Sequence, residues 1–178
     1  MKPSQVNELY QAAFIELPIV GRRMHSVLAV LDSLSRYLLA LRVSTSATTQ
    51  TLIEGLEDAL REAHRASWLD NNRKIGVVTD RDSTTTSPEF SNYILGTPFL
   101  HIFGTTRTFQ SLGMIRRLAW TLKDEEISLH NYRDPAEAQY SLERFRRTYN
   151  FERPHQALRY FVPAADLFCT KPGSQSVH

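Results

Sequence analysis

The order of short apolar runs around one amphipathic helix constrains the fold of this chain most. Three apolar runs come first, at residues 14–20, 27–31 and 37–43. Runs this short, separated by polar turns, are typical of strands in a covered sheet. A helix is predicted over residues 48–66, because Leu52, Leu56 and Leu60 recur every four residues opposite a charged face.

Strands and helices continue to alternate in the second half. Residues 75–78 and 98–103 predict two further strands, and Ser87-Pro88 begins a short helix between them. Two longer helices follow, over residues 109–127 and from the capping residue Asp134. A strand, a crossover helix and another strand form the unit of a mixed α/β sheet.

Composition excludes several classes of protein. With 178 residues the chain suits one domain, expected over residues 1–165 with a flexible tail at 166–178. Its lone cysteine, Cys169, allows no intrachain disulfide and no multi-cysteine zinc site. No signal peptide and no membrane-spanning run is recognisable, so we expect a cytoplasmic protein without a membrane partner. The net charge of +2 permits DNA binding without indicating it.

A long motif near the C-terminus carries a family resemblance. Residues 149–160 read YNFERPHQALRY and are followed by Pro163-Ala164. This resembles the signature that closes the integrase catalytic core of many bacterial insertion-sequence transposases. Residues 3–6, 27–37, 78–80 and 121–123 are similar to other segments of that family in the same order. The resemblance implies an RNase H-like α/β fold, with a mixed five-stranded sheet and helices on both faces.

The resemblance also implies a catalytic site of two aspartates and one glutamate that hold two Mg²⁺ ions for phosphoryl transfer. Asp80 matches the second aspartate. Arg116, with 35 residues between it and Asp80, occupies the position of the glutamate. Counting from the N-terminal segment places the first aspartate at Tyr10, and counting from Gly21 places it at Ala13, which we prefer.

One acid of three is a poor metal site, and an arginine adds a permanent positive charge. We therefore expect no cofactor, with Mg²⁺ or Mn²⁺ bound at Asp80 only if Asp82 or Glu16 rebuilds the site. Glu16 lies three residues from Ala13 and should point to the opposite face of its strand. An ion pair between Asp80 and Arg116 is expected instead.

These patterns predict a catalytically inactive integrase-core domain that retains at most DNA binding or self-association. A homodimer, DNA and an intact transposase are the expected partners. Candidate nucleic-acid contacts are Arg116, Arg117, Arg144 and Arg147, although an ordinary charged surface also explains them. The alternatives are an active nuclease or strand transferase with relocated acids, and a non-binding remnant of a mobile element. Trp68 and Trp120 are interpreted as core or interface anchors.

Overall fold

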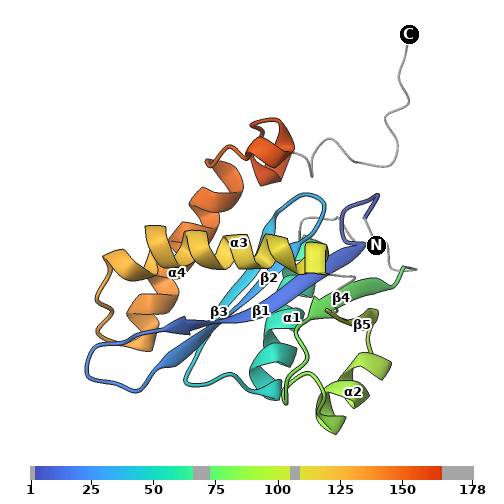
Figure 1. The fold of residues 1–178 in the computed structure, drawn as a ribbon, viewed down its shortest axis with the longest axis horizontal. Coiled ribbons are helices and arrows are strands. Elements are labelled where there is room, and N and C mark those ends of the chain that lie inside the picture. The colour runs from blue at the N-terminus through green and yellow to red at the C-terminus, as the bar shows by residue number, and fades with distance from the viewer. Residues whose placement is uncertain (1–2, 66–72, 105–108, 166–178) are drawn as a thin grey trace.

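The computed structural model describes residues 3–65, 73–104 and 109–165 and contains one five-stranded sheet in the order β3-β2-β1-β4-β5 (Figure 1). The strands are β1 (Leu9–Leu17), β2 (His25–Asp32), β3 (Leu38–Ser44), β4 (Ile75–Thr79) and β5 (Phe99–Phe103). The first three pair antiparallel, whereas β4 runs parallel to β1 and β5 runs parallel to β4. The sheet is mixed, as predicted.

Helices cover both faces of this sheet (Figure 1). They are α1 (Thr49–Arg65), α2 (Pro88–Leu95), α3 (Phe109–Glu125) and α4 (Pro135–Phe151), with short 3-10 turns at Ile127–Leu129 and Gln156–Leu158. Leu52 and Leu56 of α1 and Phe90 of α2 belong to one buried cluster. Ile115 of α3 and Leu142 of α4 belong to a second cluster. The predicted architecture of helices on both faces is therefore confirmed.

The position of the first strand was predicted wrongly. β1 begins at Leu9 and ends at Leu17, whereas the apolar run indicated residues 14–20. The cause is Gln11, which is fully buried in the strand yet interrupts the apolar pattern. The long helix α3 also ends at Glu125, before the predicted residue 127, because the chain continues into a 3-10 turn. The expected tail at 166–178 and Trp68 lie outside the described residues.

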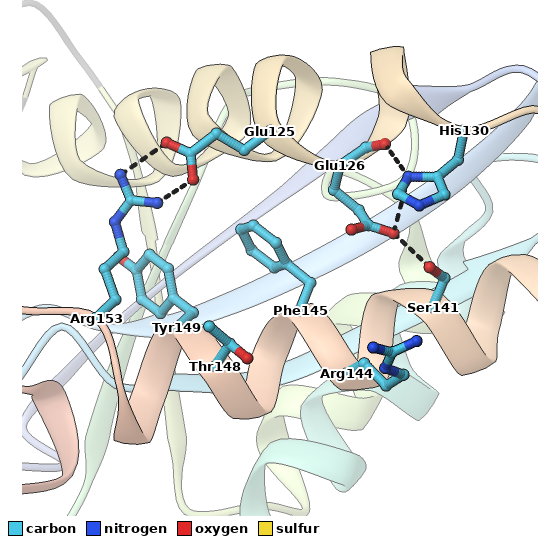
Figure 2. Close-up of a pocket in the computed structure, with 9 residues that line it drawn as sticks. All are labelled: Glu125, Glu126, His130, Ser141, Arg144, Phe145, Thr148, Tyr149 and Arg153. Carbon is cyan, nitrogen blue, oxygen red and sulfur yellow. Dashed lines mark hydrogen bonds and ion pairs between the residues drawn. The ribbon is translucent and has the colours of Figure 1, made fainter.

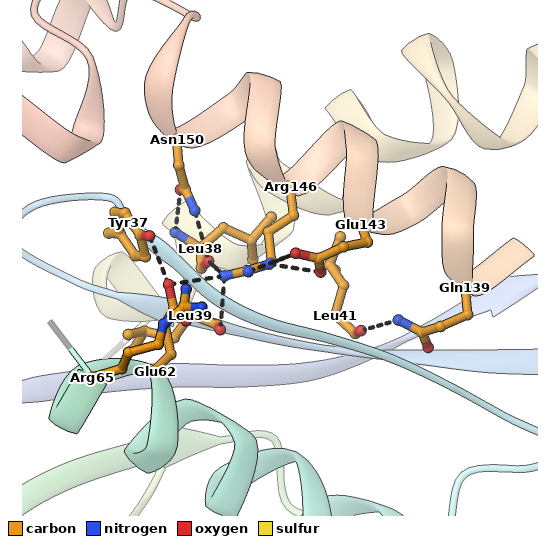
Figure 3. A network of polar contacts seen from close by, with 10 residues as sticks. All are labelled: Tyr37, Leu38, Leu39, Leu41, Glu62, Arg65, Gln139, Glu143, Arg146 and Asn150. Atoms are coloured by element: carbon orange, nitrogen blue, oxygen red, sulfur yellow. Dashed lines mark hydrogen bonds and ion pairs between the residues drawn. The ribbon is translucent and has the colours of Figure 1, made fainter.

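Side chains of α4 hydrogen-bond to the backbone of the edge strand β3 (Figure 3). Asn150 accepts from the N–H of Leu38 at 2.8 Å and donates to its carbonyl at 2.9 Å. Gln139 repeats this pattern with the N–H of Val43 and the carbonyl of Leu41, at 2.8 and 2.9 Å. The two amides thus replace part of the ladder that a sixth strand would supply.

Arg146 adds a charged group to the same network (Figure 3). Its guanidinium donates to Glu143 and lies 3.5 Å from Glu62, and it reaches the carbonyls of Leu38 and Leu39 at 3.3 Å. Although burial opposes its charge, Glu143 and Glu62 raise the pKa of Arg146 above its ordinary value. The dense run of arginines in α4 therefore includes one with a structural role.

Candidate functional site at the ends of β1 and β4

The parallel pairing of β1 and β4 places two of the predicted site positions side by side. Leu9 is level with Gly76, and Gln11 is level with Val78. Continuing this register by two residues brings Ala13 level with Asp80, which directly follows β4. Partners in register point to the same face of a sheet. Ala13 and Asp80 therefore face the layer that contains α3.

The two candidates for the first position lie on opposite faces of the sheet. Tyr10 is fully buried among the residues that pack against α1 and α2, and its hydroxyl donates to Asn7 at 2.7 Å. Ala13 instead packs against the cluster that contains Ile115 of α3. Only Ala13 shares a face with Asp80, so the geometry favours the Ala13 alignment over the Tyr10 alignment.

Gln11 fixes α3 against this end of the sheet. Its side-chain oxygen accepts a hydrogen bond from the N–H of Ile115 at 3.0 Å, and its amide nitrogen donates to Ser33 at 3.1 Å. Arg116 follows Ile115 directly in the helix. A polar residue within an otherwise apolar strand is the sequence signal for this buried contact, and the sequence analysis did not single out Gln11.

Asp80 and Arg116 form the predicted ion pair. The Arg116 guanidinium donates to the Asp80 carboxylate at 3.3 Å, and the side chains of Arg116 and Asp80 are 46% and 58% exposed. A carboxylate beside a guanidinium is a poor donor set for a divalent cation, because Mg²⁺ needs several oxygen ligands and is repelled by the arginine. Among the described residues, no cluster of three or more His, Cys, Asp or Glu side chains is arranged to hold a metal ion. These residues do not fit a metal pair.

Of the two acids considered as substitutes, Asp82 is hydrogen-bonded within the loop after β4 and Glu16 lies on the other face of β1. Asp82 accepts hydrogen bonds from the N–H groups of Thr84 and Thr85, at 2.8 and 3.0 Å, and so closes the loop after β4. Burial opposes the charge of Asp82, but these bonds hold its pKa below the ordinary value. Glu16 is exposed three residues from Ala13, on the other face of β1 as expected.

Comparisons with known proteins point to one fold. Residues 101–163 match the family model described as Integrase core domain. A chain of the simian T-cell lymphotropic virus intasome, solved in complex with PP2A regulatory subunit B56 gamma, superposes with a TM-score of 0.73 and 14% identity; the match covers 100% of this chain and 59% of that chain. This chain therefore spans less than two thirds of the length of that intasome chain.

Two isolated catalytic cores are also similar. The HTLV-2 integrase catalytic core domain, in complex with magnesium, has a TM-score of 0.57 at 13% identity and covers 92% of this chain and 98% of its own. The catalytic core domain of BIV integrase has a TM-score of 0.63 at 12% identity, with 92% and 95% covered. The fold is that of an integrase catalytic core. The resemblance seen in the sequence is confirmed, and its bacterial insertion-sequence origin stays a prediction.

The structure separates the predicted basic residues of this chain. Arg116 lies beside Asp80, whereas Arg117 lines a groove on another side of α3. Arg144 lines a pocket of about 350 Å³ between α3 and α4 together with acidic Glu125 and Glu126 (Figure 2). Arg147 is exposed on α4. The four arginines therefore do not form one patch.

Two further features of the chain were missed or misread. Arg36 lines the same groove as Arg117, but the sequence had indicated only a turn at this position. Trp120 is 76% exposed on α3, so it is not a core residue. Its spacing of four residues from Arg116 places both on one side of the helix. Of the described helices, none is long and apolar enough to cross a bilayer.

Proposed function

We propose that this integrase core has lost metal-dependent phosphoryl transfer and acts by binding DNA. The observation that carries the first part is the ion pair between Asp80 and Arg116. When the register of β1 with β4 is extended by two residues, Ala13 comes level with Asp80. A guanidinium does not deprotonate in proteins, so its repulsion of a divalent ion persists at every working pH. Asp80 is the remaining acid of the presumed triad, and its partner is a cation.

The exposed side of α3 supports the second part of the proposal. Arg116, Trp120 and Lys123 follow one another at spacings of four and three residues, and all three are exposed. A cationic helix side with an aromatic ring suits a nucleic-acid backbone and its unpaired bases. Among the similar proteins, one core is recorded with magnesium and another chain comes from an intasome. We infer that the chain still binds DNA although it no longer catalyses phosphoryl transfer.

Metal binding tests the loss of chemistry directly. We would titrate Mn²⁺ by calorimetry into the native chain, Asp80→Ala, and the double variant Ala13→Asp with Arg116→Glu. The native chain should show no micromolar binding, and the double variant should gain it, because three carboxylates then converge. Micromolar binding by the native chain that disappears in Asp80→Ala would contradict the proposal and favour a nuclease with relocated acids.

DNA binding is tested by fluorescence anisotropy with a labelled duplex of about 20 base pairs at two salt concentrations. We expect binding that weakens steeply as salt rises, because phosphate contacts release counterions. A plasmid-nicking assay with Mn²⁺ should show no cleavage. If the native chain neither binds DNA nor self-associates, the chain is a folded remnant and the proposal fails.

Self-association is the second proposed activity, because one similar integrase core is recorded in a dimeric form. A homodimer would also allow mixed assembly with an intact transposase. Analytical ultracentrifugation of the native chain across micromolar concentrations should show a dimer in equilibrium with the monomer. A monomer at every concentration would remove the homodimer from the proposal and leave DNA binding to be judged separately.

A further inference from the structure

A groove of about 590 Å³ lies between α3 and the segment that follows α4. One wall is formed by the end of β2 and the turn after it, and the opposite wall by the end of α4 and residues 153–157. Its floor includes apolar side chains of α3. The lining residues used below are Arg36, Arg117, Thr121, Arg153, His155 and Gln156. This groove is distinct from the position of Asp80 and Arg116, which do not line it.

The charge of the groove is one-sided. Three arginines line it, and none of its lining residues is acidic. Arg153 is paired with Glu125. Within the part of the chain that the structure describes, neither Arg36 nor Arg117 forms an ion pair. Burial, and to a smaller extent Arg117, lower the pKa of Arg36. Arg36 is partly buried and Arg117 is exposed, and two neighbouring cations are stabilised when an anion joins them.

Arg36 is held in place by its backbone rather than by an ion pair. The Asp32 carboxylate accepts from the N–H groups of Leu34 and Ser35, at 3.1 and 2.8 Å. The Arg36 N–H donates to the carbonyl of Asp32 at 3.1 Å, and Arg36 has a left-handed φ of 62°. That conformation is uncommon for arginine. The turn therefore presents the base of this side chain in a fixed direction, which lowers the entropy lost on binding.

The opposite wall adds polar groups without negative charge. His155 is fixed by its backbone, which donates to the carbonyl of Phe161 at 3.0 Å and accepts from the N–H of Tyr160 at 2.8 Å. Its Nε2 atom is buried and has no hydrogen-bond partner among the described residues. The side chains of Thr121 and Gln156 also line the groove. The hydroxyl of Thr121 and the amide of Gln156 can donate to an oxyanion, and the lining brings no carboxylate to repel it.

We propose that this groove binds a phosphate group through Arg36 and Arg117, with the DNA backbone as its source. The planar guanidinium matches two phosphate oxygens at once, and its charge persists at every working pH. The choice of DNA as the source rests on the DNA binding proposed above. The phosphate site itself stands on the groove, its two arginines without ion pairs and the absence of acids from its lining.

The test compares two charge-matched double variants of the full chain. Arg36→Gln with Arg117→Gln removes the two arginines, and Arg22→Gln with Arg23→Gln removes two exposed arginines from the turn between β1 and β2, at the other end of β2. A labelled 20-base-pair duplex is titrated by anisotropy, and inorganic phosphate is titrated by NMR chemical shifts. Thermal unfolding verifies that each variant is folded. Arg117→Gln alone repeats the test if the Arg36 variant does not fold.

We expect the groove variant to bind DNA at least tenfold more weakly, with the slope of log affinity against log salt reduced by about two. The control should stay within twofold of its parent. Equal DNA binding by parent and groove variant overturns the phosphate site while DNA binding itself stands. If the parent binds inorganic phosphate through both arginines but does not bind DNA, the phosphate site is supported, and a small phosphorylated molecule is its ligand. The same result refutes the proposed function. If the parent binds neither the duplex nor inorganic phosphate, both the phosphate site and the proposed DNA binding are overturned.

Discussion

The side chain of Asn150, at the end of α4, hydrogen-bonds to both the N–H and the carbonyl of Leu38, 112 residues away in sequence. It makes the two contacts that a residue of a neighbouring strand would make. The side chain is fully buried. Asn150 belongs to the motif that carried the family resemblance, and its contacts give that position a structural reason. Part of the motif therefore serves the fold and not the chemistry.

Asn150→Ala should lower the free energy of unfolding by about 2–3 kcal/mol, because the buried N–H of Leu38 would lose its partner. Urea unfolding followed by circular dichroism measures this change. Gln156→Ala is a suitable control, since Gln156 is exposed in the same motif and should change stability by less than about 0.5 kcal/mol. Equal effects of the two variants would refute the edge-strand role of Asn150.

The sequence predicted the order of elements because apolar spacing and helix caps are local signals. Ser87 and Asp134 cap their helices as expected, accepting from Phe90 and Glu137. The ion pair of Asp80 with Arg116 was also predicted, since the spacing of the family motif placed both residues. Gln11 and Arg36 were not recognised as functional positions. Their roles depend on contacts with α3 that arise only after the sheet and helices pack together.

Two helical glycines should respond oppositely to alanine. In Gly55→Ala, the new Cβ would clash with Leu28 in the core, so we expect destabilisation by about 1–2 kcal/mol. In Gly113→Ala the Cβ meets no atom within 4 Å, so the higher helix propensity should stabilise the protein by about 0.5–1 kcal/mol. Chemical denaturation of both variants measures the difference. A stabilising Gly55→Ala would show that Leu28 can move aside.

Stability should decrease as pH falls from 7.5 to 5.5. Burial lowers the pKa of His101 and His155 below the ordinary 6.5, and Arg153 and Arg36 lower that of His155 further. The unfolded chain therefore takes up protons first as the pH drops below about 6.5, and the folded state loses stability down to its own lower pKa values. Urea unfolding across this range measures the slope.

His101→Gln with His155→Gln should flatten that pH dependence. Each glutamine keeps a polar side chain but does not titrate. A variant with the same slope as the native chain would assign the dependence to other groups. The comparison uses the slope, so it is valid even if the double substitution lowers stability at every pH.

Asp80→Asn and Arg116→Gln should each change the free energy of unfolding by less than about 1 kcal/mol, because the pair is half exposed to solvent. Thermal or urea unfolding measures this. The expectation matters for the metal experiment, since Asp80 variants must fold as the native chain does. A loss of several kcal/mol would indicate that the pair supports the fold, which its exposure does not favour.

The hydrogen bonds between α4 and β3 also concern the growing chain. The edge strand is complete once residue 44 has been synthesised, yet the residues that seal it, Gln139, Arg146 and Asn150, come about a hundred residues later. Until then the strand has unpaired backbone groups beside an apolar sheet face, which is a template for pairing with another chain. Fragments that end before α4 should therefore aggregate during synthesis, and the addition of α4 closes this edge of the newly made sheet.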